Sequence, residues 1–125
     1  MEFIESPAFT RHLPDYLSNE GYRALQNELA SNPQAGDLMP GTGGFRKVRW
    51  ADPRRGKGRR GGLRIVYYYF PRDQEIWLVT LFDKEEASDL SPKEKKALKA
   101  AIEAELEWRK ARQERRIRNS GGIRE

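Results

Sequence analysis

The sequence of 125 residues contains no cysteine and only one histidine, His12. The lack of cysteine excludes a disulfide framework, a thiolate zinc site and a cysteine nucleophile. His12 has no cysteine or second histidine with which to share a metal ion, so we expect it to have a surface or packing role. The carboxylates are scattered, without a spacing that predicts a shared cleft. We therefore expect no metal and no cofactor, and neither metal-dependent hydrolysis nor histidine-based catalysis is supported.

Long apolar runs are also missing. No segment approaches the roughly 20 apolar residues that a helix needs to span a bilayer. The N-terminal sequence MEFIESPAF lacks the basic-then-apolar order of a secretion signal. The absence of cysteine is compatible with a reducing compartment. These features predict a soluble cytoplasmic protein without a membrane partner.

Apolar residues make up only 37% of the chain, and charged residues make up 34%. Five Tyr, five Phe and three Trp nevertheless supply large side chains for a core, unlike the composition of a typical disordered protein. A chain of this length suits one compact core, because two halves would each bury too little surface. We expect a single domain over residues 1–116 and a flexible basic tail over residues 117–125.

The N-terminal third predicts a short strand followed by an antiparallel pair of helices. The apolar run at residues 1–4 reads as the strand, and Ser6 can cap the helix that follows it. Apolar residues recur at helical spacing as far as residue 17, although Pro14 should end or kink this helix. A second helix should begin at Ser18 or Asn19 and stop before Pro33.

The rest of the chain predicts three strands and a last helix. A glycine-rich turn, Gly41 to Gly44, precedes runs that alternate or are rich in β-branched and aromatic residues, at 45–50, 63–70 and 75–82. Ser91 and Glu94 have the spacing of a capping box at the start of the helix. Its apolar face ends near Trp108, beyond which we expect it to fray. The pattern therefore predicts an α+β fold with an antiparallel-dominated small sheet, a helical hairpin packed on it and a C-terminal helix.

Basic residues are concentrated in one segment. Nine of the 24 Lys and Arg residues fall between Arg46 and Arg64, where Asp52 is the only acidic residue. The remaining 15 basic and 18 acidic residues give the rest of the chain a slightly negative charge, so the net charge of +5 comes from this segment. A charge concentrated in this way favours a polyanionic partner, since basic side chains that contact phosphates release condensed counterions.

The strand predicted at residues 45–50 places Lys47 and Arg49 on one face by its alternation. The tyrosines at 67–69 on the next strand could stack on bases, a combination typical of single-stranded RNA recognition. The alternative is that these cations guard a sheet edge and the glycine-rich basic loop between the strands is merely solvated.

Three segments in this order, GTGGFRKVRW, GGLRIVYYY and FDKEEASDLSPKEKKAL, resemble the HigB-type branch of the RelE/HigB superfamily of bacterial toxins. The resemblance covers about residues 1–107 and implies a RelE-like fold. It also implies a toxin of a type II toxin-antitoxin system, an endoribonuclease that enters the ribosomal A site and cuts mRNA. The implied partners are mRNA, the ribosome and a cognate antitoxin, often a helix-turn-helix protein through which DNA is bound indirectly.

The resemblance also implies site residues. The family's basic pair on the second strand falls on Lys47 and Arg49, its third-strand arginine on Arg64, and a basic residue after the last strand on Lys84. Leu90 stands where the family often has a catalytic tyrosine, which leaves Tyr67 or Tyr68 as substitutes. We expect the other basic residues of the segment to bind RNA or the ribosome: Arg46, Arg54, Arg55, Lys57, Arg59 and Arg60.

RNA cleavage without a metal ion requires a base for the 2′-hydroxyl, an acid for the leaving 5′-oxygen and cations for the charge on the phosphorane. We expect Arg49 and Arg64 to stabilise the phosphate, Lys47 to bind phosphate or transfer a proton, and Lys84 to support them. Crowding by other cations would lower the pKa of Lys47 and help proton transfer. Two other hypotheses remain open: a non-catalytic RNA- or ribosome-binding module, and a basic loop that docks an acidic protein.

Overall fold

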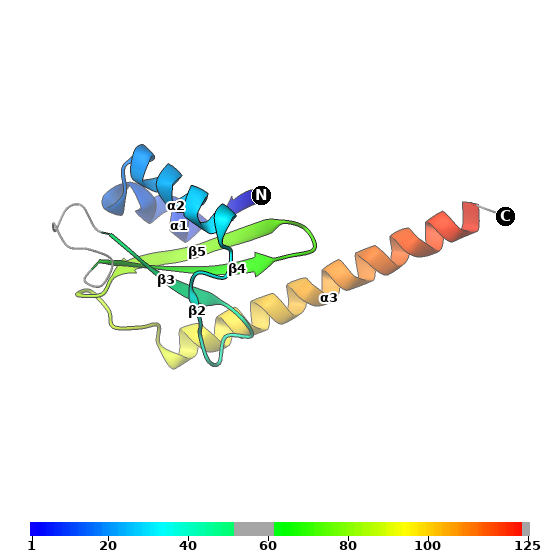
Figure 1. Ribbon diagram of the computed structural model, residues 1–125. Helices are drawn as coiled ribbons and strands as arrows, with labels where there is room; N and C mark the ends of the chain where they lie inside the picture. Colours follow the sequence, from blue (N-terminus) through cyan, green and yellow to red (C-terminus); the bar gives the residue numbers. More distant parts are fainter. Residues whose placement is uncertain (52–61, 124–125) are drawn as a thin grey trace.

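The computed structural model describes residues 1–51 and 62–123. The strands and helices of these residues follow one another along the chain, and Figure 1 labels them. In order they are β1 (Glu2–Glu5), α1 (Pro7–Tyr16), α2 (Asn19–Ser31), β2 (Asp37–Leu38), β3 (Arg46–Trp50), β4 (Leu63–Phe70), β5 (Glu75–Asp83) and α3 (Pro92–Ile123).

The strands form one mixed sheet in the order β1-β5-β4-β3-β2. Neighbouring strands are antiparallel except β1, which pairs in parallel with the first half of β5, from Glu2 opposite Glu75 to Glu5 opposite Leu78. Helices α1 and α2 cover one face, and α3 runs across the other (Figure 1). The predicted α+β class and element order are confirmed. The two-residue strand β2 was not predicted.

Serine caps position both N-terminal helices. The Ser6 hydroxyl accepts a hydrogen bond from the Phe9 amide at 3.0 Å and donates one to the Val79 carbonyl at 2.6 Å, so it also joins α1 to the sheet. Ser18 caps α2 in the same way, accepting from the Gly21 amide at 3.0 Å. Both predicted starts are confirmed. Pro14 lies inside α1, and the helix ends two residues beyond it, at Tyr16, since proline has no amide to donate to the carbonyl four residues earlier.

The first core lies between the helical hairpin and the sheet. Its fully buried members from the helices are Phe9, Leu25 and Leu29, and those from the strands include Ile65 and Leu78. Burial of a side chain of this size contributes about 1.5 to 3 kcal/mol. This core fixes which face each strand residue occupies.

The second core lies between the sheet and α3. Phe45, Val66, Phe70 and Ile102 are buried in it, with half-buried Tyr68 among them. The Tyr68 ring lies 5.2 Å from that of Phe45 and 4.7 Å from that of Phe70, centroid to centroid. Such tilted aromatic contacts add to the burial free energy. This second layer holds the start of α3 on the sheet.

The predicted turn at Gly41 to Gly44 is confirmed, and it links β2 and β3 to α3. Gly41 and Gly43 both have positive φ, at 80° and 78°. A Cβ added to Gly43 would lie 2.9 Å from Cγ2 of Ile102, whereas one added to Gly41 would meet nothing within 4 Å. Glycine is therefore required at position 43 by both backbone and packing.

We predict that Gly43→Ala destabilises the protein more than Gly41→Ala does. Both substitutions incur left-handed backbone strain of about 1 to 2 kcal/mol. Only Gly43→Ala also overpacks the contact with Ile102, for about 1 to 3 kcal/mol more. Urea unfolding of the two variants measures the difference, and equal destabilisation would show that the loop moves freely away from α3.

Helix α3 begins with the predicted capping box. The Ser91 amide donates to the Glu94 carboxylate at 2.9 Å, and the Glu94 amide donates to the Ser91 hydroxyl at 3.1 Å. The helix continues to Ile123. The prediction that it frays beyond Trp108 is therefore wrong, and its distal half projects away from the sheet (Figure 1). Among residues 1–51 and 62–123, no helix is both long and apolar enough to cross a membrane.

Candidate nucleic-acid interface

The alternation of β3 and β4 brings three of the predicted site residues onto the sheet face that α3 partly covers. Val48 lies in the first core, so its neighbours Lys47 and Arg49 point to the other side of β3. Arg49 and Arg64 are direct cross-strand partners, and Lys47 lies opposite Val66. Residues paired in this way have Cβ atoms about 5 Å apart. We call Lys47, Arg49 and Arg64 the basic face.

Arg64 is the buried member of the basic face, with 9% of its surface exposed. Its guanidinium donates to the backbone carbonyls of Gly62 at 3.2 Å and Leu63 at 3.3 Å. Burial and the charge of Arg49 lower the pKa of Arg64, and the charge of Asp83 opposes this effect. Like charges on opposed strands destabilise a sheet. An anion bound between the two guanidinium groups would relieve that repulsion.

Lys47 has an acidic neighbour that the sequence did not predict. Its Nζ lies 3.2 Å from Oδ1 of Asp89, whose Oδ2 lies 2.7 Å from Nζ of Lys95 on α3. The hydrogen bond from Lys95, with further contributions from Leu90 and Lys47, lowers the pKa of Asp89 from 3.8 to about 2 despite its partial burial. Asp89 is therefore ionised at neutral pH, and its contribution to stability is lost as the pH falls from about 4 to about 2.

The two tyrosines proposed as substitutes for the missing catalytic tyrosine lie on opposite faces. Tyr67 is fully buried in the first core, where its hydroxyl donates to the Pro33 carbonyl at 2.7 Å and accepts from the Gly36 amide at 2.9 Å. It points away from the basic face and holds the segment before β2. Tyr68 lies on the same face as Lys47, and burial raises its pKa. A phenol with a raised pKa stays protonated, so it is better suited to donate a proton than to remove one.

Lys84 and Leu90 flank the basic face. Lys84 follows β5 directly and is exposed, and its amide lies 3.5 Å from the Gly62 carbonyl, beside the start of β4. It is therefore at the same end of the sheet as Arg64. Leu90 is half-buried in the second core. An apolar side chain at this position packs the loop before α3 and supplies no group for proton transfer.

The remaining predicted RNA contacts divide into two groups. Arg46 lies on the opposite face from Lys47, and its guanidinium donates to the Gly36 carbonyl at 2.8 Å. This bond braces the segment between α2 and β2, so Arg46 is separated from the basic face by the sheet itself. The others lie outside the described residues: Arg54, Arg55, Lys57, Arg59 and Arg60.

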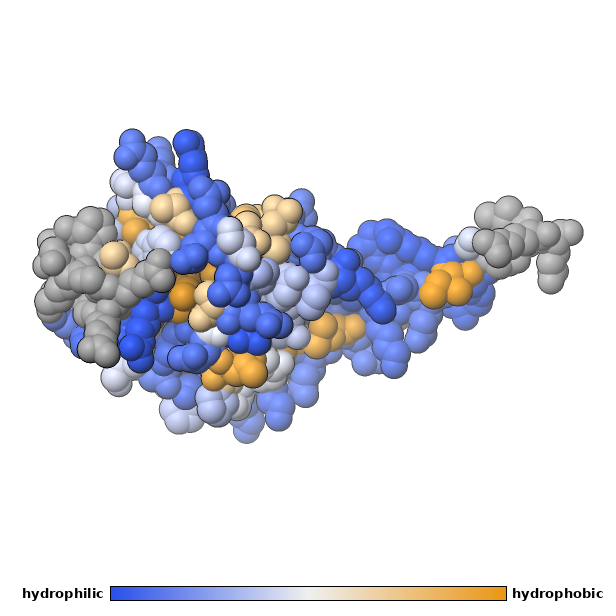
Figure 2. Space-filling model, in the orientation of Figure 1, coloured by the Kyte–Doolittle hydropathy of each residue, from blue (hydrophilic) through white to orange (hydrophobic). Residues whose placement is uncertain are grey.

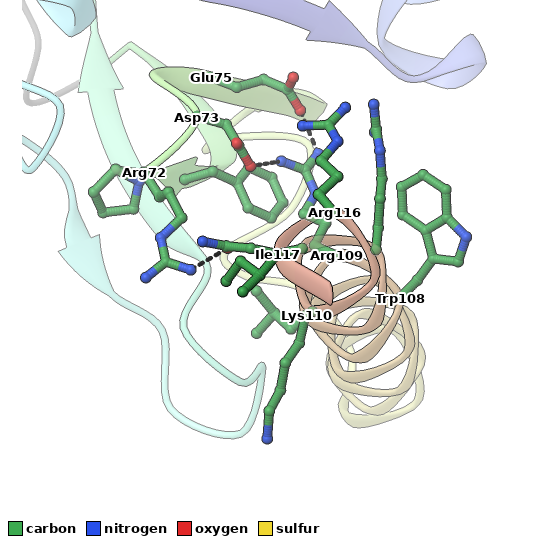
Figure 3. A pocket seen from close by; sticks show the side chains of 13 residues that line it. Arg72, Asp73, Glu75, Trp108, Arg109, Lys110, Arg116 and Ile117 are labelled. Atoms are coloured by element: carbon green, nitrogen blue, oxygen red, sulfur yellow. Dashed lines mark hydrogen bonds and ion pairs between the residues drawn. The ribbon is translucent and has the colours of Figure 1, made fainter. Parts of the chain in front are cut away.

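A second cluster of charged residues, which the sequence did not predict, surrounds Arg109. Its guanidinium is bound to Asp73 at 2.7 Å and to Glu75 (Figure 3). It is also bound to Glu105, on the same helix, at 2.7 Å. It also stacks over Phe70, with 3.8 Å from Cζ to the ring centroid. Although burial lowers the pKa of Arg109, the three carboxylates raise it above the usual value. This cluster fixes α3 to the turn between β4 and β5.

An open groove of about 720 Å³ lies beside this cluster, between the β4–β5 turn and α3 (Figure 3). Its lining includes Arg72, Trp108, Lys110 and Arg116. Within the described parts of the chain, no three His, Asp or Glu side chains are grouped so that they could hold a metal ion. His12 is exposed on α1, as predicted for a surface residue.

No protein-family model matches the chain. The structure shows a small α+β protein in which two opposed arginines and a lysine share one face of a mixed five-stranded sheet. Such an arrangement can bind an anion with several oxygens, above all a phosphate.

Proposed function

We propose that this protein is a metal-independent endoribonuclease that cleaves mRNA on the ribosome and thereby inhibits translation. The observation that carries the proposal is the direct cross-strand pairing of Arg49 with Arg64, beside Lys47 on the same face. In the same proposal the chain is a RelE/HigB-type toxin, held inactive in its own cell by a cognate antitoxin. The three sequence segments that resemble this superfamily support that relationship, and the α+β element order agrees with it.

In the proposed reaction the 2′-hydroxyl of the RNA loses its proton to solvent as its oxygen attacks the adjacent phosphorus, and the bond from phosphorus to the 5′-oxygen breaks. The leaving 5′-oxygen takes up a proton, so that the products are a cyclic phosphate and a 5′-hydroxyl. Arg49 and Arg64 neutralise the charge that builds on the phosphorane oxygens. Lys47 is placed to bind the same phosphate or to donate the proton, and Lys84 adds positive charge at this end of the sheet.

Asp89 competes with RNA for Lys47 in this proposal. A phosphate that reaches Lys47 must displace a carboxylate now 3.2 Å from its Nζ. We predict that Asp89→Asn tightens RNA binding several-fold, since it removes a negative charge from the phosphate position. Fluorescence anisotropy with a labelled RNA measures the change. Glu20→Gln on α2, which removes an exposed carboxylate from the other side of the sheet, is the matched control, and equal effects would exclude a specific role for Asp89.

A non-catalytic RNA- or ribosome-binding module is the second candidate, and two observations favour it. Leu90 occupies the place at which a catalytic tyrosine would be expected, and Tyr68 has a raised pKa that disfavours a role as general base. Such a protein would use the same basic face to bind without cutting. A third possibility, a basic loop that docks an acidic protein, predicts binding that survives removal of all RNA.

Inducible expression in bacterial cells tests the proposed function. We expect growth arrest with the natural sequence and loss of the arrest with Arg49→Gln. Arg49 is exposed, so this variant should keep its fold while losing one of the two opposed charges. Arg23→Gln, an exposed arginine on α2, should remain toxic. Growth arrest without new mRNA ends would favour the binding module, and no arrest at matched expression would contradict the nuclease.

A further inference from the structure

The distal half of α3 is a basic arm, which a hydrogen bond from Arg72 in the β4–β5 turn to Gln113 joins to the sheet. Beyond Gln113 the helix leaves the sheet, and its surface is mostly hydrophilic (Figures 1 and 2). Residues 110–118 contain five basic side chains and one acidic side chain, a net charge of +4. These residues are strong helix formers, which explains how the helix persists without a core beneath it. A projecting helix of one charge sign presents a surface for a partner of the opposite sign.

The basic residues of the arm are not spread evenly around it. Trp108, Arg112, Arg115 and Arg116 have the spacing of one helical flank, which we call the arm stripe. Trp108 is 57% exposed and lies at the edge of the open groove between the β4–β5 turn and α3 (Figure 3). The guanidinium of Arg112 lies 5.3 Å from the centroid of the Trp108 ring. Glu114, the acidic residue of this segment, lies on a different side.

We propose that the arm stripe is a second RNA-binding surface, separate from the basic face. Its three arginines bind phosphates, for which the planar guanidinium fork is well suited, and Trp108 offers an exposed ring on which a base can stack. The choice of RNA as the polyanion rests on the proposed function. Lys95 lies near the basic face, since it shares Asp89 with Lys47. The helix from Lys95 to Arg112 of the arm stripe is about 25 Å long. One RNA could therefore contact both surfaces only if it extends along the molecule.

The exposed apolar residues of the arm do not fit a protein helix as the occupant. Leu106 and Ile117 share one side of α3, where they are 40% and 65% exposed. Lys110 and Gln113 interrupt that side between them. A packed helix pair needs apolar residues in each successive turn of the seam. The continuous feature of the arm is its charge, which favours phosphates over an apolar partner.

Two double variants of the full-length protein, with the same change in charge, test this inference. Arg112→Gln with Arg115→Gln alters the arm stripe, and the control, Lys110→Gln with Arg118→Gln, alters other sides of the same helix. The probe is a fluorescein-labelled RNA stem-loop, titrated at several salt concentrations. We expect the stripe variant to bind the RNA about tenfold more weakly near physiological salt. The slope of log K against log salt concentration should become less steep by about 0.7 to 0.9 for each phosphate contact that the variant has lost. The control variant should change little.

Equal weakening in both variants would show that the arm acts only through its total charge. Unchanged affinity in the stripe variant would show that the arm stripe does not bind RNA. Either result overturns the inference. So would stripe-dependent binding of a poly-glutamate peptide in the absence of RNA binding. Cleavage on ribosomes, assayed separately with Arg49→Gln, distinguishes the two proposals. A protein that never cleaves RNA but shows the stripe-dependent affinity would refute the proposed function and leave this inference standing.

Discussion

Replacing Arg64 with alanine should lower the rate of RNA cleavage by about 10²-fold or more, because the variant has one cation fewer opposite the phosphorane. The structure adds a second effect. Arg64 is buried and bonded to two backbone carbonyls, so the substitution should also destabilise the fold by about 1 to 3 kcal/mol. A variant of unchanged stability, as a purely catalytic role would predict, is therefore not expected.

Arg64→Lys separates these two effects. It keeps the positive charge but loses the guanidinium fork, so it should retain most of the stability and only part of the activity. Cleavage should be compared at equal concentrations of folded protein, with urea unfolding measured alongside. Full activity of Arg64→Ala under these conditions would show that Arg64 takes no part in the reaction.

Arg109→Ala should destabilise the protein by about 1 to 3 kcal/mol, the cost of leaving a buried polar partner unsatisfied in a cluster that is partly open to solvent. Three carboxylates converge on this guanidinium, and Glu75 among them is only 9% exposed. The variant would leave Glu75 without its cation and Phe70 without the group stacked on it. Helix α3 would then no longer be fixed to the β4–β5 turn.

The urea midpoint of unfolding measures this effect, and Arg112→Ala is the control. Arg112 is exposed on the same helix, three residues further on, and its replacement should change stability by no more than about 0.5 kcal/mol. Similar midpoints for the two variants would show that the cluster around Arg109 is screened by solvent and contributes little.

Local signals predicted much of the fold. The caps at Ser6 and Ser91, the glycine turn and the alternation in β3 each depend on a few neighbouring residues, and each is confirmed. The persistence of α3 to Ile123 was missed because we required an apolar face for a stable helix. Residues 109–118 are Arg, Lys, Ala, Gln and Glu with one Ile, whose intrinsic propensity favours helix without such a face. The parallel pairing of β1 with β5 joins residues too far apart in sequence for a local signal.

In the candidate site, too, the local features were predicted and the contacts between distant segments were not. Alternation was sufficient to place Lys47 and Arg49 together, and the hairpin of β3 with β4 added Arg64 opposite them. Which residues surround these cations depends on the loop before α3, which brings Asp89 to Lys47 across 42 positions of sequence. Tyr67 and Tyr68 could not be assigned to faces until the position of the first core was known.

Cleavage of mRNA on translating ribosomes is the claim on which the account depends. Purified protein should be added to a reconstituted translation reaction, and the 5′ ends of the message should be mapped by primer extension. We predict new ends at ribosome-bound codons with the natural sequence and none with Arg49→Gln at the same concentration. An intact message in a reaction whose ribosomes have bound the protein would contradict the nuclease and leave a binding module in its place.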